Sequence, residues 1–132
     1  MKKILIIAVI SLLSLVSCQR EGSKSAAPAK QEIKENVRYK LFPTENIWTF
    51  LKLDTKNGKI WQVQYSMDDN FRGEVELNIK ALVPDNAAEN GRFTLYPTKN
   101  MYNFILLDQM DGKMWQVQWS TEEDNRLIIP MQ

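Results

Sequence analysis

One stretch of 29 residues occurs twice in the chain. Residues 38–66 and residues 92–120 align without a gap at a constant offset, and 15 of the 29 positions are identical. Unrelated segments of average composition would agree at roughly one position in fifteen. The duplication therefore predicts a fold made of two similar units, with copies at about 36–83 and 90–132.

Each copy has the pattern of short β-strands. Apolar and polar residues alternate before Pro43 and Pro97, which indicates a strand that proline ends, and the Pro-Thr-x-Asn sequence that follows is typical of a turn. Two runs rich in aromatic and branched residues come next. They flank Asn57-Gly58 in the first copy and Asp111-Gly112 in the second, which predicts a β-hairpin.

A fourth alternating segment, residues 75–81, follows the first hairpin, and residues 126–131 form its shorter counterpart. The composition, with 44% hydrophobic and 25% charged residues, is that of a globular domain. We therefore predict an all-β fold of two tandem-duplicated four-stranded antiparallel meanders. They would pack as a pseudo-twofold sandwich or an eight-stranded barrel.

The loop of the hairpin determines which side chains face each other. A three-residue loop, Lys56-Asn57-Gly58, with the glycine in the left-handed conformation, would set Leu53 opposite Trp61. The register shifted by one residue would set Lys52 opposite Trp61 instead. We expect the first register, because it gives both copies one uniform apolar face.

In that register the opposite face combines aromatic rings with amide side chains. Besides Lys52 and its equivalent Leu106, it carries Trp48, Phe50, Gln62 and Gln64 in the first copy and Tyr102, Phe104, Gln116 and Gln118 in the second. Such a face can pack partly under a loop or the other copy, or form an oligomer contact. It can also bind a ligand that stacks on the rings and is oriented by the amides. We take these eight residues as candidate ligand-binding residues.

The first 18 residues have the pattern of a secretory signal peptide. A basic start with Lys2 and Lys3 precedes an apolar run, and Leu15-Val16-Ser17-Cys18 ends it. The sequence LVSC resembles the lipobox of bacterial lipoproteins, which implies that Cys18 becomes the lipid-bearing N-terminus. Residues 19–35 are polar and small, which predicts a flexible tether between the lipid and a domain spanning 36–132.

Two further resemblances concern the envelope and the repeat. Gln19 is not the aspartate that signals inner-membrane retention in some lipoproteins. Resemblance to lipoproteins therefore implies the outer membrane of a Gram-negative cell, facing the periplasm or the outside. The duplicated motif also resembles small uncharacterised repeat lipoproteins of such bacteria. LDxxxGKxWQ is similar to the outer hairpin of quinoprotein-type propeller repeats, but two units cannot close a propeller, and we expect no cofactor.

The residue content argues against an enzyme. The chain has no histidine and a single cysteine, so Ser-His-Asp and Cys-His arrangements are excluded. The repeated acids Asp54 and Asp108 stand just before tight turns, where aspartate typically caps the backbone. The acidic segments 66–70 and 120–125 do not have the pattern of a calcium loop, so we expect no metal site.

The net charge of the chain indicates which classes of partner it can attract. The formal net charge is +1, and about −1 without Lys2 and Lys3, which offers no field that would attract nucleic acid. We expect a non-catalytic lipoprotein, anchored to the membrane by its lipid, that binds an envelope glycan, peptide or protein. The alternatives are an inhibitor or immunity-type protein acting through loops 67–73, 84–91 and 121–125, and a structural component of the envelope.

Overall fold

Strands and short 3₁₀ turns make up the described part of the chain, residues 36–132 of the computed structural model. The predicted signal peptide 1–18 with Cys18 and the tether 19–35 lie outside the described residues. Within 36–132 no helix is long and apolar enough to cross a membrane. These residues build a hydrophobic core of their own, so they form a self-contained folding unit.

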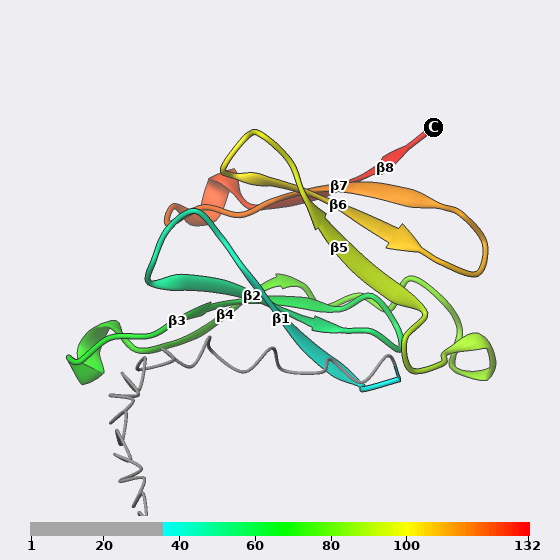
Figure 1. Ribbon diagram of the computed structural model, residues 1–132, viewed down its shortest axis with the longest axis horizontal. Coiled ribbons are helices and arrows are strands. Elements are labelled where there is room, and N and C mark those ends of the chain that lie inside the picture. Colours follow the sequence, from blue (N-terminus) through cyan, green and yellow to red (C-terminus); the bar gives the residue numbers. More distant parts are fainter. Residues whose placement is uncertain (1–35) are drawn as a thin grey trace, which may run out of the picture. The chain divides into compact units, whose positions relative to one another are not determined.

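The strands form two antiparallel four-stranded sheets, one from each copy of the repeat (Figure 1). The first sheet contains β1 (Tyr39–Pro43), β2 (Thr49–Asp54), β3 (Ile60–Gln64) and β4 (Gly73–Asn78). The second contains β5 (Phe93–Pro97), β6 (Asn103–Asp108), β7 (Met114–Gln118) and β8 (Leu127–Met131). The prediction of an all-β fold with two tandem meanders is confirmed. The two sheets form separate layers, so the sandwich exists and the barrel does not close.

The Pro-Thr-x-Asn sequence makes the turn between the first two strands of each sheet. The Thr44 hydroxyl donates to the Thr49 carbonyl at 2.9 Å and accepts from the Asn46 N–H at 3.1 Å. The Asn46 side-chain oxygen accepts from the Trp48 N–H at 2.9 Å. Thr98 and Asn100 make the same bonds in the second copy. The motif recurs because its side chains satisfy backbone groups that the turn leaves without a ladder partner.

The hairpin loop is one residue longer than predicted, and the predicted register is therefore wrong. Asp54 pairs with Lys59 through a 2.9 Å backbone bond, and Lys52 lies opposite Trp61. The loop closes through Gly58, whose N–H donates to the Asp54 carbonyl and whose φ of 80° is left-handed, as expected for this glycine. Thr55 does not pair with Lys59, because its backbone bonds elsewhere. The second copy has the same register.

Thr55 joins the two copies instead. Its N–H donates to the Arg38 carbonyl and its own carbonyl accepts from the Phe93 N–H, both at 2.8 Å. Its hydroxyl donates to the Val37 carbonyl at 2.7 Å and accepts from the Gly91 N–H at 2.9 Å. The side chain is fully buried. Thr55, the residue after β2, thus holds the start of β5 in place. Because its backbone groups are used there, Thr55 takes no part in the hairpin ladder.

The two sheets have the same register but bury opposite faces of the repeat. On the first sheet the buried face carries Leu51 and Leu53, both 0% exposed. On the second sheet the buried face carries Leu106, also 0% exposed, which corresponds to Lys52 on the outer side of the first sheet. A twofold axis would bury the same face of both copies. The copies are therefore stacked face to back, and the predicted twofold relation is wrong.

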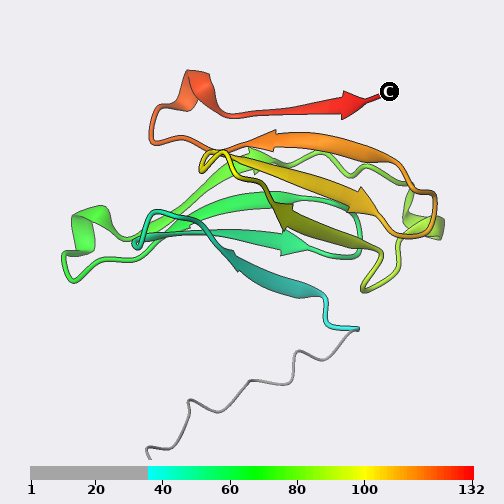
Figure 2. The same ribbon diagram turned by 45° about the horizontal axis from the view of Figure 1, so that its top comes forward.

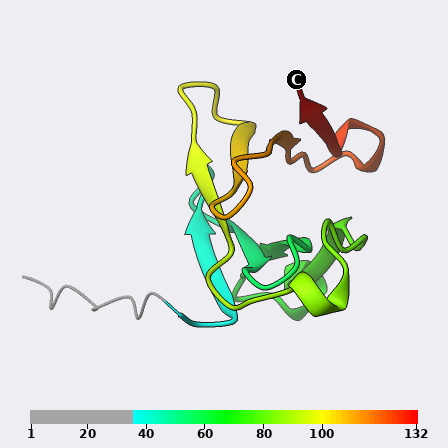
Figure 3. The same cartoon turned by 90° about the vertical axis from the view of Figure 1, so that its right-hand side faces the viewer.

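The arrangement of the turns agrees with this stacking. Equivalent strands of the two sheets, such as β2 and β6, point the same way (Figure 2). The equivalent turns at Thr44 and Thr98 line one small cavity of about 20 Å³. Seen from the side, the sheet that contains β8 lies over the sheet that contains β4 (Figure 3). The second copy is thus placed on the first in the same orientation.

Candidate functional site: a pocket at the edge between the sheets

The aromatic residues predicted for the first copy lie on the outer side of the first sheet. Trp48 and Phe50 both contact Tyr65, with ring centroids 5.3 and 5.9 Å apart. In the observed register Phe50 lies opposite Val63, so the glutamines of β3 point to the other side of the sheet. The prediction of one face that combines rings with amides is therefore wrong, for the same reason as the register.

The other predicted residues are dispersed. Phe104 is 3% exposed in the core, and Gln116 lies exposed on the outer side of the second sheet. Tyr102 and Gln118 line a surface hollow of about 350 Å³ beside the β7–β8 turn. The Gln118 amide donates to the Asn125 carbonyl at 2.9 Å, so its N–H group is already used within the protein.

Gln62 and Gln64 come together in a second hollow, of about 280 Å³, which we call the edge pocket. It lies where the β3–β4 connection of the first sheet meets the β7–β8 turn of the second. The first sheet contributes both glutamines, and further lining residues are Asn70, Phe71, Arg72, Gly73, Glu74, Val75, Thr121 and Arg126. The pocket is thus lined by amides, two cations and one exposed ring.

Gln62 is the notable member of the edge pocket. Its side chain is 4% exposed, and its Oε1 is buried without a hydrogen-bond partner among the described residues. Its equivalent, Gln116, donates to Asn103 Oδ1 at 2.9 Å. In the first copy the shorter Thr49 replaces Asn103, so this bond of the amide nitrogen has no counterpart, and it does not involve Oε1. A buried acceptor without a donor is costly, by about 1–3 kcal/mol.

Two equivalent arginines, Arg72 and Arg126, line the pocket together with the carboxylate of Glu74. Arg126 Nε donates to the Ser120 carbonyl at 2.9 Å, which positions the guanidinium without neutralising it. Arg72 pairs with the exposed Asp69, and Glu74 on the pocket rim pairs with Lys52. The pocket is therefore lined by the largely buried amide of Gln62 and by the guanidinium groups of Arg72 and Arg126. A ligand with both hydroxyl or N–H groups and acceptor oxygens would match this arrangement.

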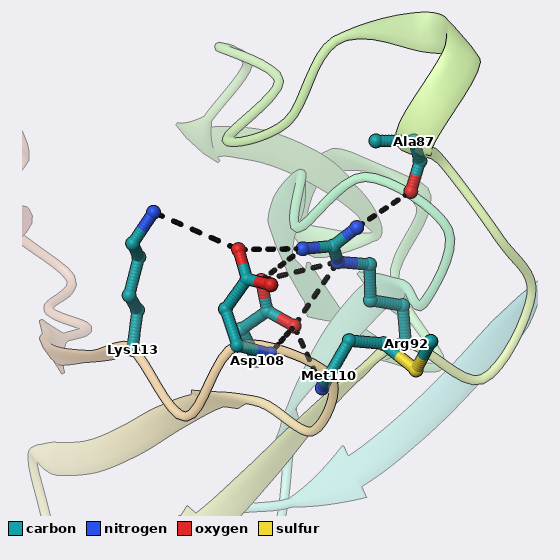
Figure 4. Close-up of polar contacts among 6 residues, drawn as sticks. Ala87, Arg92, Asp108, Met110 and Lys113 are labelled. Atoms are coloured by element: carbon teal, nitrogen blue, oxygen red, sulfur yellow. Dashed lines mark hydrogen bonds and ion pairs between the residues drawn. The ribbon is translucent and has the colours of Figure 1, made fainter.

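The repeated carboxylates are structural. Asp54 Oδ1 accepts from the Lys56 N–H at 3.1 Å, and Asp108 Oδ1 accepts from the Met110 N–H at 2.9 Å. Both therefore cap their turns, as predicted. Arg92 binds Asp108 and also donates to the Ala87 carbonyl at 2.7 Å (Figure 4).

Burial of Asp108 opposes its ionisation, but hydrogen bonds from Arg92 and from the backbone N–H groups of Met110 and Asp111 outweigh it. The pKa of the Asp108 carboxyl group is therefore lowered. The hydrogen bond to Asp108 raises the pKa of Arg92. Both groups are thus held in their charged forms by each other. Within residues 36–132 no group of three or more His, Cys, Asp or Glu side chains could hold a metal ion.

The comparisons add no relative: no protein-family model, no curated protein and no solved structure matches the chain. The edge pocket was only partly predictable. Gln62 and Gln64 were singled out from the sequence, whereas Arg72 and Arg126 were not. Both arginines lie outside the duplicated stretch, but they are separated by the same offset as its two copies. The constant offset between the copies thus continues beyond Ser66 and relates these two arginines to each other.

Proposed function

We propose that this chain is a lipid-anchored, non-catalytic binding protein of the bacterial envelope, which takes a segment of a glycan or peptide into the edge pocket. The LVSC sequence and the polar tether support the anchor, through Cys18. The observation that carries the binding role is the unpaired, buried Oε1 of Gln62 at the pocket. A ligand hydroxyl or N–H group would supply the missing donor.

The size and lining of the pocket favour a small polar segment. Its volume of about 280 Å³ is near the lower end of the roughly 300–1,000 Å³ typical of ligand sites. The exposed ring of Phe71 offers an apolar surface against which a sugar ring or a peptide side chain can lie. Arg72 and Arg126 favour a ligand that also carries acceptor oxygens or negative charge.

The test begins with residues 36–132, screened against glycan and peptide arrays, and the best ligand is then titrated by calorimetry. Gln62→Met keeps the volume of the side chain and removes the unpaired acceptor. We expect this variant to lose affinity at least tenfold, while its free energy of unfolding rises by about 1 kcal/mol. A purely structural glutamine would not produce these two opposite changes.

Gln116→Met is the matched control, because it changes the equivalent glutamine on the outer side of the second sheet. Its affinity for the same ligand should equal that of the unmodified protein. If Gln62→Met also binds with unchanged affinity, the edge pocket is not the binding site.

A second candidate function is an inhibitor or immunity-type role for the loop 67–73. Met67 is 95% exposed and Phe71 61% exposed, and both belong to this loop. Apolar side chains at a loop tip are suited to insertion into the cleft of another protein. The double substitution of Met67 and Phe71 by serine would abolish capture of such a protein, whereas Gln62→Met would leave it unchanged.

A further inference from the structure

Stacking the two copies face to back leaves two unlike faces free. We define the front face as the outer side of the first sheet, where Tyr39, Leu41 and Tyr65 are 49%, 61% and 45% exposed. We define the back face as the outer side of the second sheet. There Tyr96 and Met114 are 50% and 40% exposed. Exposed apolar side chains gathered on a sheet face indicate an interaction surface.

The interface inside the molecule already joins these two kinds of face. Phe42 of the first sheet lies on the side of the repeat that forms the back face in the second sheet. It packs against a core cluster that contains Leu95 of the second sheet, which lies on the side that forms the front face in the first sheet. On the free faces, Tyr96 stands at the position equivalent to Phe42, and Leu41 at the position equivalent to Leu95. The front face therefore lies on the same side of the repeat as the inner side of the second sheet, which packs against the first sheet.

The strands of the front face carry Lys52, Glu74 and Glu76, and the first two neutralise each other. Lys52 pairs with Glu74, and its ammonium group lies 4.6 Å from the centre of the Trp61 ring. The back face contains no charged residue at its strand positions, but the amides of Gln116 and Gln118 lie on it. Amides can bond to a paired lysine and glutamate. Lys52 stands where the core has Leu106, so the contact should be weaker than the internal one.

We propose that a second copy of this chain docks head to tail, with its front face on the back face of the first. The contact continues the established sheet-to-sheet interface in the same direction. It is a heterologous contact, because different surfaces of the two molecules meet. Each added copy presents the same free faces again, so association proceeds beyond a dimer as the concentration rises.

The test uses one blocking substitution on each face of residues 36–132. Leu41→Lys blocks the front face and Tyr96→Lys blocks the back face, and both side chains are at least half exposed, so neither supports the core. Circular dichroism checks that the variants fold. In sedimentation equilibrium we expect the unmodified protein to grow in mass with concentration past the dimer. Each variant alone should associate at least tenfold more weakly.

An equimolar mixture of the two variants decides the geometry. Leu41→Lys keeps a usable back face and Tyr96→Lys keeps a usable front face, so the mixture should form dimers and stop there. Lys52→Leu, which copies the residue of the second sheet, should strengthen association at least tenfold, and the control Glu89→Lys on an exposed loop should not change it.

Two results would overturn the proposal. One is an unmodified protein that remains monomeric over the whole concentration range. The other is a dimer that one of the two blocking variants abolishes and the other leaves intact, because such a dimer joins two identical faces about a twofold axis.

Discussion

Arg92 and Asp108 form a doubly hydrogen-bonded ion pair inside the protein. Arg92 Nε lies 3.0 Å from Asp108 Oδ1 and Nη2 lies 2.8 Å from Oδ2, and the side chains are 8% and 0% exposed. Arg38 and Asp54 hold the equivalent positions in the first copy, but there the arginine side chain is 52% exposed. Both carboxylates are buried, so the two copies of this interaction differ in the exposure of the arginine alone.

The two arginines should differ in their contribution to stability. Arg92→Ala leaves the charge of Asp108 buried without its partner, so we expect the free energy of unfolding to fall by about 3–5 kcal/mol. Arg38→Ala, the matched control, should cost less, because Arg38 is half exposed and water can take its place beside the buried Asp54 carboxylate. Urea denaturation of both variants measures the difference. Equal losses would show that the burial of Arg92 has no energetic consequence.

Stability should decrease in acid because of Asp108. Its pKa is lowered in the folded protein, so the folded state favours the carboxylate. The stability this provides is fully present above the unfolded pKa of about 3.9 and is lost as the pH falls through the folded pKa. Thermal unfolding followed from neutral pH to about pH 2 should show a shallower decline for Asp108→Asn than for the unmodified protein.

The control for this slope is Asp124→Asn, because Asp124 is exposed in the β7–β8 turn. Its profile should follow that of the unmodified protein. Identical slopes for Asp108→Asn and the unmodified protein would mean that another group governs the acid transition.

The two hairpin glycines test the contact between the copies. Gly58 and Gly112 have φ values of 80° and 74°, so alanine is strained at both, by about 1 kcal/mol. A Cβ atom at Gly58 would also lie 2.8 Å from Leu82 Cδ1 and 3.3 Å from Phe93 Cε1, whereas nothing lies within 4 Å at Gly112. Gly58→Ala should therefore destabilise more than Gly112→Ala. Melting curves that shift equally would count against this packing.

The face-to-back stacking predicts unequal costs at one aromatic position of the repeat. Trp119 is 1% exposed and its Nε1 donates to the Met101 carbonyl at 2.8 Å, so Trp119→Ala should cost about 3–5 kcal/mol. Tyr65, its equivalent, is 45% exposed, and Tyr65→Ala should cost about 1–2 kcal/mol. Guanidinium unfolding of the two variants distinguishes this arrangement from a twofold sandwich, in which the costs would be alike.

The lipid anchor has a direct chemical test. If Cys18 carries the lipid, Cys18→Ala abolishes incorporation of labelled palmitate in growing cells, because no other thiol exists in the chain. Ser14→Ala, within the apolar segment, should still be labelled. Label that persists in Cys18→Ala would contradict the proposed anchor.

The strands, the turns and the duplication were predictable because they depend on neighbours in sequence. Alternation, Pro-Thr-x-Asn and the glycine after Asn57 or Asp111 each act over a few residues. The hairpin register was not predictable in the same way. In both copies the residue after the second strand, Thr55 or Gln109, donates its N–H to the carbonyl of the arginine that precedes the first strand. This contact lies outside the hairpin, so the local turn pattern does not reveal that the residue is absent from the hairpin ladder.

The prediction of the candidate site depended on the predicted register of the hairpin. With Lys52 opposite Trp61, the glutamines and the aromatic residues separate onto opposite sides of the sheet, so the predicted combined platform does not form. Gln62 lies in an uncommon environment, but the sequence pattern placed it beside rings rather than between layers. The duplication itself suggested that both copies use the same face. Face-to-back packing contradicts that expectation, because the buried side of the first sheet contacts the opposite side of the repeat in the second sheet.

Thr55 also has a consequence for how the protein comes apart. Units of a repeat protein that touch only their neighbours can detach one at a time, beginning at an end. Here the residue that leaves the first hairpin bonds through its N–H, carbonyl and hydroxyl groups to both sides of the junction. Opening either layer breaks those bonds, so heating should melt both halves in a single cooperative transition instead of releasing the second half alone.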